Sequence, residues 1–218
     1  MIRARSRTHR LARSPVFWLT MLLGVVLLGC GIFQIAVHYA PYGYVREVSA
    51  AEQAARQQLV QAAVEYLGCN EDDGSYKAII DLYNTQDPLP ADYQVQYADQ
   101  WCATFGSVAA MQCGMTRIIP TECSCQRQIE LFNGLGCWEE DDAYVPLPGD
   151  YIFYHTGHRG SGDCTHWSNH VGIVVGVWGS YIKVIEGNCY EAVQYRFIPL
   201  DHESIRGFGL PDYSGVVE

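Results

Sequence analysis

The sequence has little positive charge outside its N-terminus. Five of its 14 basic residues lie within the first 13 positions, before any acidic residue, namely Arg3, Arg5, Arg7, Arg10 and Arg13. From Arg46 onward, nine basic residues face 24 acidic ones. Nucleic-acid binding depends largely on Lys and Arg contacts to phosphate, so this charge balance argues against a nucleic-acid partner. Charge would not help the chain to bind anionic wall polymers either, which leaves peptides and small neutral groups as the easier substrates.

Charged residues are absent from 16–37, which reads VFWLTMLLGVVLLGCGIFQIAV. As a helix, these 22 residues would extend about 33 Å, close to the thickness of a bilayer hydrocarbon core. We expect a single-pass anchor, with the basic residues 1–15 in the cytoplasm. Two alternatives stay open: a cleaved secretory signal, and a lipoprotein signal in which residues 27–30, LLGC, resemble a lipobox and Cys30 is lipidated. All three place the remaining chain outside the cytoplasm.

Nine cysteines are typical of a protein in an oxidising compartment. Apart from Cys30 and Cys102, seven remain, so at most three disulfides form among these and one thiol stays free, with the pairing open. Zinc binding is the competing use. However, a single residue separates Cys123 from Cys125, instead of the usual two to four, and no second matched pair follows. We therefore expect no metal and no cofactor.

After a linker at 38–48, the pattern predicts one α+β domain over 49–218. Helices are expected at 49–68 with Ser49 as the cap, at 75–82 with Ser75 as the cap, from Cys102 to residue 111, and at 124–135. The short β-rich runs that follow Pro146 lie at 151–155, 170–178, 181–186, 192–198 and 206–210. The helices precede the strands in the sequence, and this order predicts an α+β fold in which helices pack on an antiparallel sheet.

Cys102 opens one of the predicted helices. The positive end of a helix dipole favours a thiolate over a thiol, and the thiolate is the nucleophilic form. A buried core cysteine, or half of a disulfide, is the alternative at this position. Cys102 therefore needs a base beside it to be a catalytic nucleophile.

His170 is the candidate base because it opens the predicted strand HVGIVVGV. Strict alternation places the odd-numbered Val and Ile residues on the core face. His170, Gly172 and Gly176 then share the other face, where the glycines leave room for a substrate. An ordinary strand-end histidine is the alternative. The three preceding histidines, His155, His158 and His166, lie in a loop sequence and are expected to be exposed.

The next strand, YIKVIEGN, ends in two polar residues that could orient the imidazole, Glu186 and Asn188. A solvated strand end is the alternative. A regular two-residue turn at 179–180 would put Glu186 and His170 on opposite faces of the sheet. The site therefore requires an odd-length loop or a bulge, and a three-residue loop would favour Asn188 whereas a five-residue loop would favour Glu186.

With these residues in place, the chain resembles the CHAP family of cysteine amidohydrolases and peptidases, relatives of the NlpC/P60 group in the papain-like superfamily. The matching stretches are WCATF at 101–105, PGDYIFY at 148–154, HVGIVVGV at 170–177, IEGN at 185–188 and GFGLPDY at 207–213. The resemblance covers roughly residues 91–213. The insertion between Tyr154 and His170 and the Cys-rich segment 113–137 depart from the family pattern, so substrate specificity is not carried over.

The resemblance implies a papain-like fold and hydrolysis of an amide bond in the peptide part of peptidoglycan, with a stem or crossbridge peptide as the partner. Cys102 would be the nucleophile, His170 the general base, and Glu186 with Asn188 the orienting residues. The backbone N–H of Cys102 would stabilise the oxyanion, with Gln96 or Gln100 as further candidates. Two questions stay open: whether the enzyme is an N-acetylmuramoyl-L-alanine amidase or a crossbridge endopeptidase, and whether the domain is instead a non-catalytic wall- or partner-binding module.

Overall fold

The computed structural model describes residues 44–158 and 164–216. The chain divides into two units, residues 1–40 and 41–218, and everything described belongs to the second. The expected membrane segment at 16–37 and the lipobox cysteine Cys30 lie outside the described residues. Within the described ranges, no helix is both long and apolar enough to cross a membrane.

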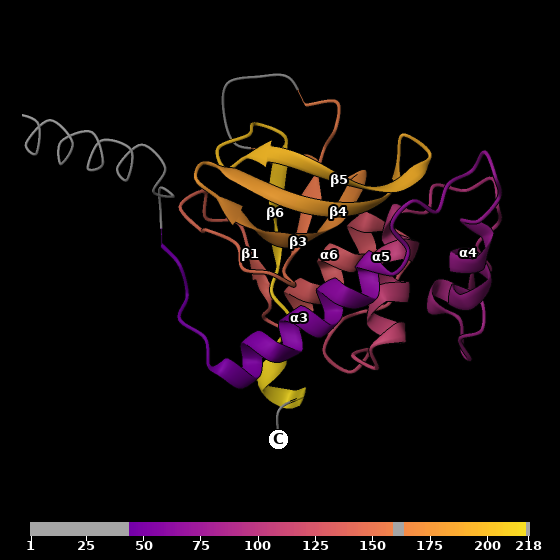
Figure 1. Ribbon diagram of the computed structural model, residues 1–218, viewed down its shortest axis with the longest axis horizontal. Helices are drawn as coiled ribbons and strands as arrows, with labels where there is room; N and C mark the ends of the chain where they lie inside the picture. Colours follow the sequence, from indigo (N-terminus) through magenta and orange to yellow (C-terminus); the bar gives the residue numbers. More distant parts are fainter. Residues whose placement is uncertain (1–43, 159–163, 217–218) are drawn as a thin grey trace, which may run out of the picture. The chain divides into compact units, whose positions relative to one another are not determined.

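The described residues form an α+β fold of four α-helices and a six-stranded antiparallel sheet (Figure 1). The α-helices are α3 (Ala50–Val64), α4 (Lys77–Tyr83), α5 (Cys102–Gln112) and α6 (Cys125–Gly134), with 3-10 turns η1 (Pro90–Asp92) and η2 (Tyr213–Val216). The strands are β1 (Trp138–Glu139), β2 (Tyr151–Tyr154), β3 (His170–Trp178), β4 (Tyr181–Cys189), β5 (Ala192–Pro199) and β6 (Ile205–Gly209). The strand order is β1-β6-β2-β3-β4-β5.

Two of the four α-helices begin with a side-chain cap. The side chain of Ser49 accepts a hydrogen bond from the first turn of α3, as predicted, and that of Ser124, for which no cap was predicted, does the same for α6. The predicted cap of α4 is wrong. Ser75 accepts a hydrogen bond from the backbone N–H of Asn70 instead, and α4 begins two residues later without a side-chain cap.

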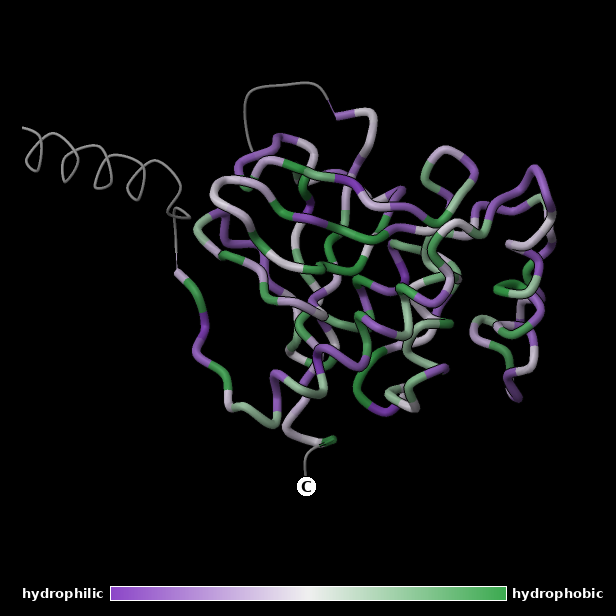
Figure 2. The backbone as a smooth tube through the Cα atoms, viewed as in Figure 1, coloured by the Kyte–Doolittle hydropathy of each residue, from purple (hydrophilic) through white to green (hydrophobic). Residues whose placement is uncertain are grey.

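Apolar side chains cover both faces of the sheet, and Figure 2 shows hydrophobic residues running along the central strands. Alternation along β2 illustrates the division. Tyr151 and Phe153 belong to the larger core, which packs against the helices, whereas Ile152 and Tyr154 belong to a smaller core on the other face. The central strands are therefore buried on two sides, and α5 packs on the β3–β4 part of the sheet.

The β3–β4 hairpin combines a two-residue turn at 179–180 with a bulge. The register of the two strands shifts by one residue at Val175, so β3 contains one residue more than its partner. This extra residue returns His170 and Glu186 to the same face. The sequence required either an odd-length loop or a bulge for His170 and Glu186 to share a face, and the structure has the bulge.

Gly172 and Gly176 do not share the open face that strict alternation predicts, because the bulge at Val175 puts them on opposite faces of β3. A Cβ at Gly172 would lie 2.7 Å from the Cγ of Glu186, and one at Gly176 would lie 2.8 Å from the ring of Trp178. Val174, between them, is fully buried. The glycines make room for neighbouring side chains of the same chain, so the expected substrate space above them is not present.

A buried ion pair joins α3 to the start of β2. Arg56 and Asp150 are almost fully buried, with 2.7 Å between Nη1 and Oδ1. Asp150 also accepts hydrogen bonds from the hydroxyl of Tyr144 and from the backbone N–H of Leu147. The guanidinium of Arg56 lies 4.5 Å from the ring centre of Tyr213. The ion pair therefore connects α3, the segment 144–150 before β2, and η2, which are distant in the sequence.

Removal of one partner should leave an uncompensated buried charge. We expect Arg56→Ala to lower the free energy of unfolding by about 3–5 kcal/mol, measured by urea denaturation. Arg46→Ala is the matched control, because the Arg46 side chain is 45% exposed and its partner Glu52 keeps a second ion pair with Arg56; the expected loss is within about 1 kcal/mol. Equal losses in the two variants would contradict a structural role for the buried pair.

Candidate active site

Close backbone packing places Cys102 at the sheet. It is the first residue of α5 and only 4% of its surface is exposed. Gly106 allows the helix to approach β2, since a Cβ there would lie 2.9 Å from the ring of Tyr151. Gly187 plays the same part on β4, where a Cβ would overlap Phe105. The helix start has no side-chain cap, so its first N–H groups remain available to an oxyanion.

Three groups stabilise a thiolate at Cys102. The Sγ atom of Cys125 lies 3.6 Å from that of Cys102. The hydrogen bond with Cys125 lowers the pKa of Cys102 most, burial opposes it, and the hydrogen bond and charge of His170, with a hydrogen bond from the Val171 backbone, lower it further. The pKa of Cys102 therefore lies well below that of an ordinary thiol. The hydrogen bond with Cys102, with burial and the charge of Cys102, raises the pKa of Cys125 well above the ordinary value.

His170 is held between the thiol and a carboxylate. Its Nε2 atom lies 3.5 Å from Oε2 of Glu186, and the ring of Tyr154 stacks on the imidazole with 6.0 Å between ring centres. Burial lowers the pKa of His170, but hydrogen bonds and charges from Cys102 and Glu186 outweigh it and raise the pKa to about 9. The site therefore favours a thiolate–imidazolium pair.

Glu186 is fully buried and is neutralised from two sides. Arg196 of β5 donates from Nη2 to Oε1 at 2.8 Å, and His170 faces the other oxygen. Burial raises the pKa of Glu186. The hydrogen bond with His170, the charge of His170 and the charge of Arg196 outweigh burial and lower this pKa below the ordinary value. Arg196 was not among the residues expected from sequence, because β5 contains no motif that marks it.

Asn188 points to a different partner. Its backbone has a φ of 53°, at an irregularity in the β4–β5 pairing. Its Nδ2 donates to Glu71 at 2.9 Å, and the same Glu71 oxygen accepts from the indole N–H of Trp101 at 2.8 Å. Asn188 therefore supports, through Glu71, the Trp101 that precedes Cys102, whereas Glu186 is the residue in contact with His170.

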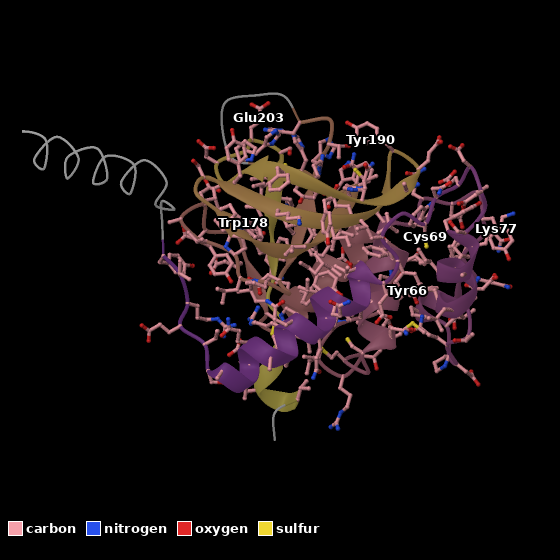
Figure 3. The ribbon with its side chains drawn as sticks, in the orientation of Figure 1. Tyr66, Cys69, Lys77, Trp178, Tyr190 and Glu203 are labelled. Carbon is pink, nitrogen blue, oxygen red and sulfur yellow. The ribbon has the colours of Figure 1, made fainter. Side chains whose placement is uncertain are left out.

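Glu71 reaches this position through backbone pairing outside the helices. Residues 68–71 hydrogen-bond with 191–193 at the start of β5. Figure 3 shows Cys69 of this segment, and it also shows Tyr190 at the β4–β5 turn, at the end of the sheet opposite Trp178 of the β3–β4 turn. Sequence reasoning missed Glu71 because it precedes the motif region by 20 residues or more.

The described cysteines form no disulfides. All eight of them are free thiols, so the expected disulfides are absent from this part of the chain. Sequence reasoning also missed Cys125, which it considered only for disulfide or zinc binding. The two glutamines suggested for the oxyanion hole are exposed, and the side-chain amide of Gln96 donates to the carbonyl of Gln94.

The loop histidines differ in part from expectation. His166 is exposed, but His155 and His158 are half-buried, and the ring of His166 lies 5.3 and 5.4 Å from theirs. One group of potential metal ligands occurs among the described residues: His170, Glu186 and Cys189, whose ligand atoms lie within 4.8 Å of one another. His, Glu and Cys side chains can bind zinc. Here, however, the imidazole of His170 and the carboxylate of Glu186 already contact each other, and Arg196 neutralises that carboxylate.

The charge state of His170 is directly measurable. We expect NMR titration of its ring to give a pKa of about 9, and Glu186→Gln to lower it because one negative partner is lost. A raised folded-state pKa means that this group stabilises the fold fully below its unfolded pKa of about 6.5, and that the contribution is lost as pH rises through 9. Asn188→Ala is the control and should leave the pKa unchanged; an equal shift in both variants would contradict the assignment.

No family model, curated protein or solved structure matches this chain.

Proposed function

We propose that this protein is a cysteine amidohydrolase that cleaves an amide bond in the peptide part of peptidoglycan. The observation that carries the proposal is the buried arrangement of Cys102 at a helix start, His170 against it, and Glu186 3.5 Å behind the imidazole. Nucleophile, base and orienting carboxylate are the three roles that acyl transfer by a cysteine requires.

The geometry supports a specific sequence of steps. The Cys102 thiolate attacks the scissile carbonyl, and the N–H groups at the start of α5 stabilise the oxyanion. His170, as imidazolium, donates its proton to the leaving amine. The neutral imidazole then takes a proton from water, which attacks the thioester and releases the acid. Glu186 holds the ring and stabilises its charged form throughout.

The arrangement of elements is consistent with a papain-like fold, in which the cysteine helix packs on an antiparallel sheet that carries the histidine and its partner. The substrate class rests on the resemblance of five ordered motifs to the CHAP family. A peptide substrate also fits the charge of the domain, because the domain is acidic and has no basic cluster that could bind anionic polymers. We place the domain outside the cytoplasm, anchored by 16–37 as a single span, with a lipid on Cys30 as the alternative.

Cys102→Ala and His170→Ala should abolish hydrolysis of purified sacculi. Glu186→Gln should lower kcat by about 10²-fold, because the imidazole loses its orientation and part of its charge stabilisation. Asn188→Ala should act less on kcat, since its amide contacts Glu71 and not His170. Release of soluble muropeptides measures all four variants.

Cys137→Ser is the matched control and should retain activity, because the Cys137 thiol contacts the carbonyl of Leu135 and no residue of the site. Undiminished lysis by Cys102→Ala would contradict the assignment of Cys102 as the nucleophile, whereas a lack of hydrolysis by the unaltered protein would favour the non-catalytic binding module. Mass spectrometry of the products identifies the bond: an N-acetylmuramoyl-L-alanine amidase releases lactyl-sugars without peptide, whereas a crossbridge endopeptidase leaves every stem peptide attached to its sugar.

A further inference from the structure

The thiol of Cys125 is placed beside the candidate nucleophile by structure and not by sequence proximity. It is the first residue of α6, is 7% exposed, and its sulfur lies 3.6 Å from that of Cys102. Among the described cysteines, this is the one pair of sulfur atoms within hydrogen-bond distance. The steps proposed above use Cys102 but assign no covalent chemistry to Cys125.

The approach of the two sulfurs is held by contacts between α5 and the entry to α6. Ser107, one turn and a half beyond Cys102, donates its hydroxyl to the carbonyl of Glu122 at 2.8 Å and accepts from the Glu122 backbone N–H at 2.8 Å. Both residues are buried. Because Glu122 precedes Cys125 by three residues, this double hydrogen bond fixes the start of α6 against α5.

We propose that Cys102 and Cys125 form a reversible disulfide, with Cys125 as the resolving thiol, and that this modification switches the catalytic site off. A disulfide bond is about 2.05 Å long, so each sulfur must move less than about 1 Å from its present position. The effect on activity rests on the proposed function. The formation of the bond does not.

The chemistry requires an oxidant, which we assign to the class of low-molecular-weight disulfides, RSSR. The Cys102 thiolate attacks one sulfur of RSSR, the S–S bond breaks, and RS⁻ leaves to take up a proton. Cys125 then loses its proton and attacks Sγ of Cys102, which expels the second RS⁻. Two protein thiols are oxidised, one RSSR is reduced to two RSH, and no other reactant is consumed.

The order of these two attacks follows from the site. While Cys102 is a thiolate, its hydrogen bond and charge raise the pKa of Cys125, so Cys102 reacts first. In the mixed disulfide, the charge on Cys102 is gone and the largest cause of that elevation is removed. Cys125 then ionises more easily at the moment when its attack is required.

The test uses the full chain, purified in detergent under reducing conditions and then exposed to glutathione disulfide. Trypsin leaves Cys102 with Cys113 in one peptide, 78–117, and Cys125 with Cys123 in another, 118–127. The control variant Cys113→Ser/Cys123→Ser removes this ambiguity. In it, peptide mass spectrometry should show one cross-link between the two peptides, which dithiothreitol reverses.

Cys125→Ser should instead hold Cys102 as a stable glutathione adduct, with circular dichroism confirming that the variant folds. A control variant that accumulates the adduct without the cross-link would overturn the proposal. In the same samples, hydrolysis of sacculi should fall at least tenfold on oxidation and return on reduction. A reversible cross-link in a chain that never hydrolyses sacculi would overturn the proposed function and leave the disulfide standing, whereas hydrolysis unaffected by the cross-link would overturn the switch.

Discussion

Everything at the site depends on a row of alternating charges that runs from the buried Cys102 through His170 and Glu186 to Arg196, whose side chain is 35% exposed. Each of these charges alone would be costly to bury, because a low-dielectric interior stabilises an isolated ion poorly. Together they compensate one another, so the pKa of the thiol falls, that of the imidazole rises and that of the carboxylate falls. The row holds only while one helix and three strands keep their relative positions.

Several features of the backbone keep those positions. The bulge at Val175 returns His170 and Glu186 to one face of the sheet, and Gly172 leaves the space that the Glu186 side chain fills. On the helix side, Gly187 allows α5 to approach β4 closely. The geometry of the candidate site is therefore built from missing Cβ atoms and one extra backbone residue, as much as from its titratable side chains.

A second thiol beside the nucleophile has two physical consequences. The hydrogen bond from Cys125 stabilises the Cys102 thiolate and so supports reactivity at neutral pH. The same proximity gives that thiolate a partner for oxidation. In an oxidising compartment, reactivity and protection against irreversible oxidation would then come from the same pair of atoms.

The sequence by itself determined the order of the four α-helices and of strands β2 to β6, but not β1, together with three of the four α-helix starts and the choice of Cys102, His170 and Glu186 as candidate site residues. Periodicity and capping are local, so they can be read from neighbouring residues. Only the tertiary structure decided that Glu186 contacts His170 while Asn188 binds Glu71, and that Cys125 and Arg196 join the site. These contacts depend on a bulge and on the packing of segments up to 117 residues apart. Neither has a local signature, because each is fixed by which backbones can approach closely in three dimensions.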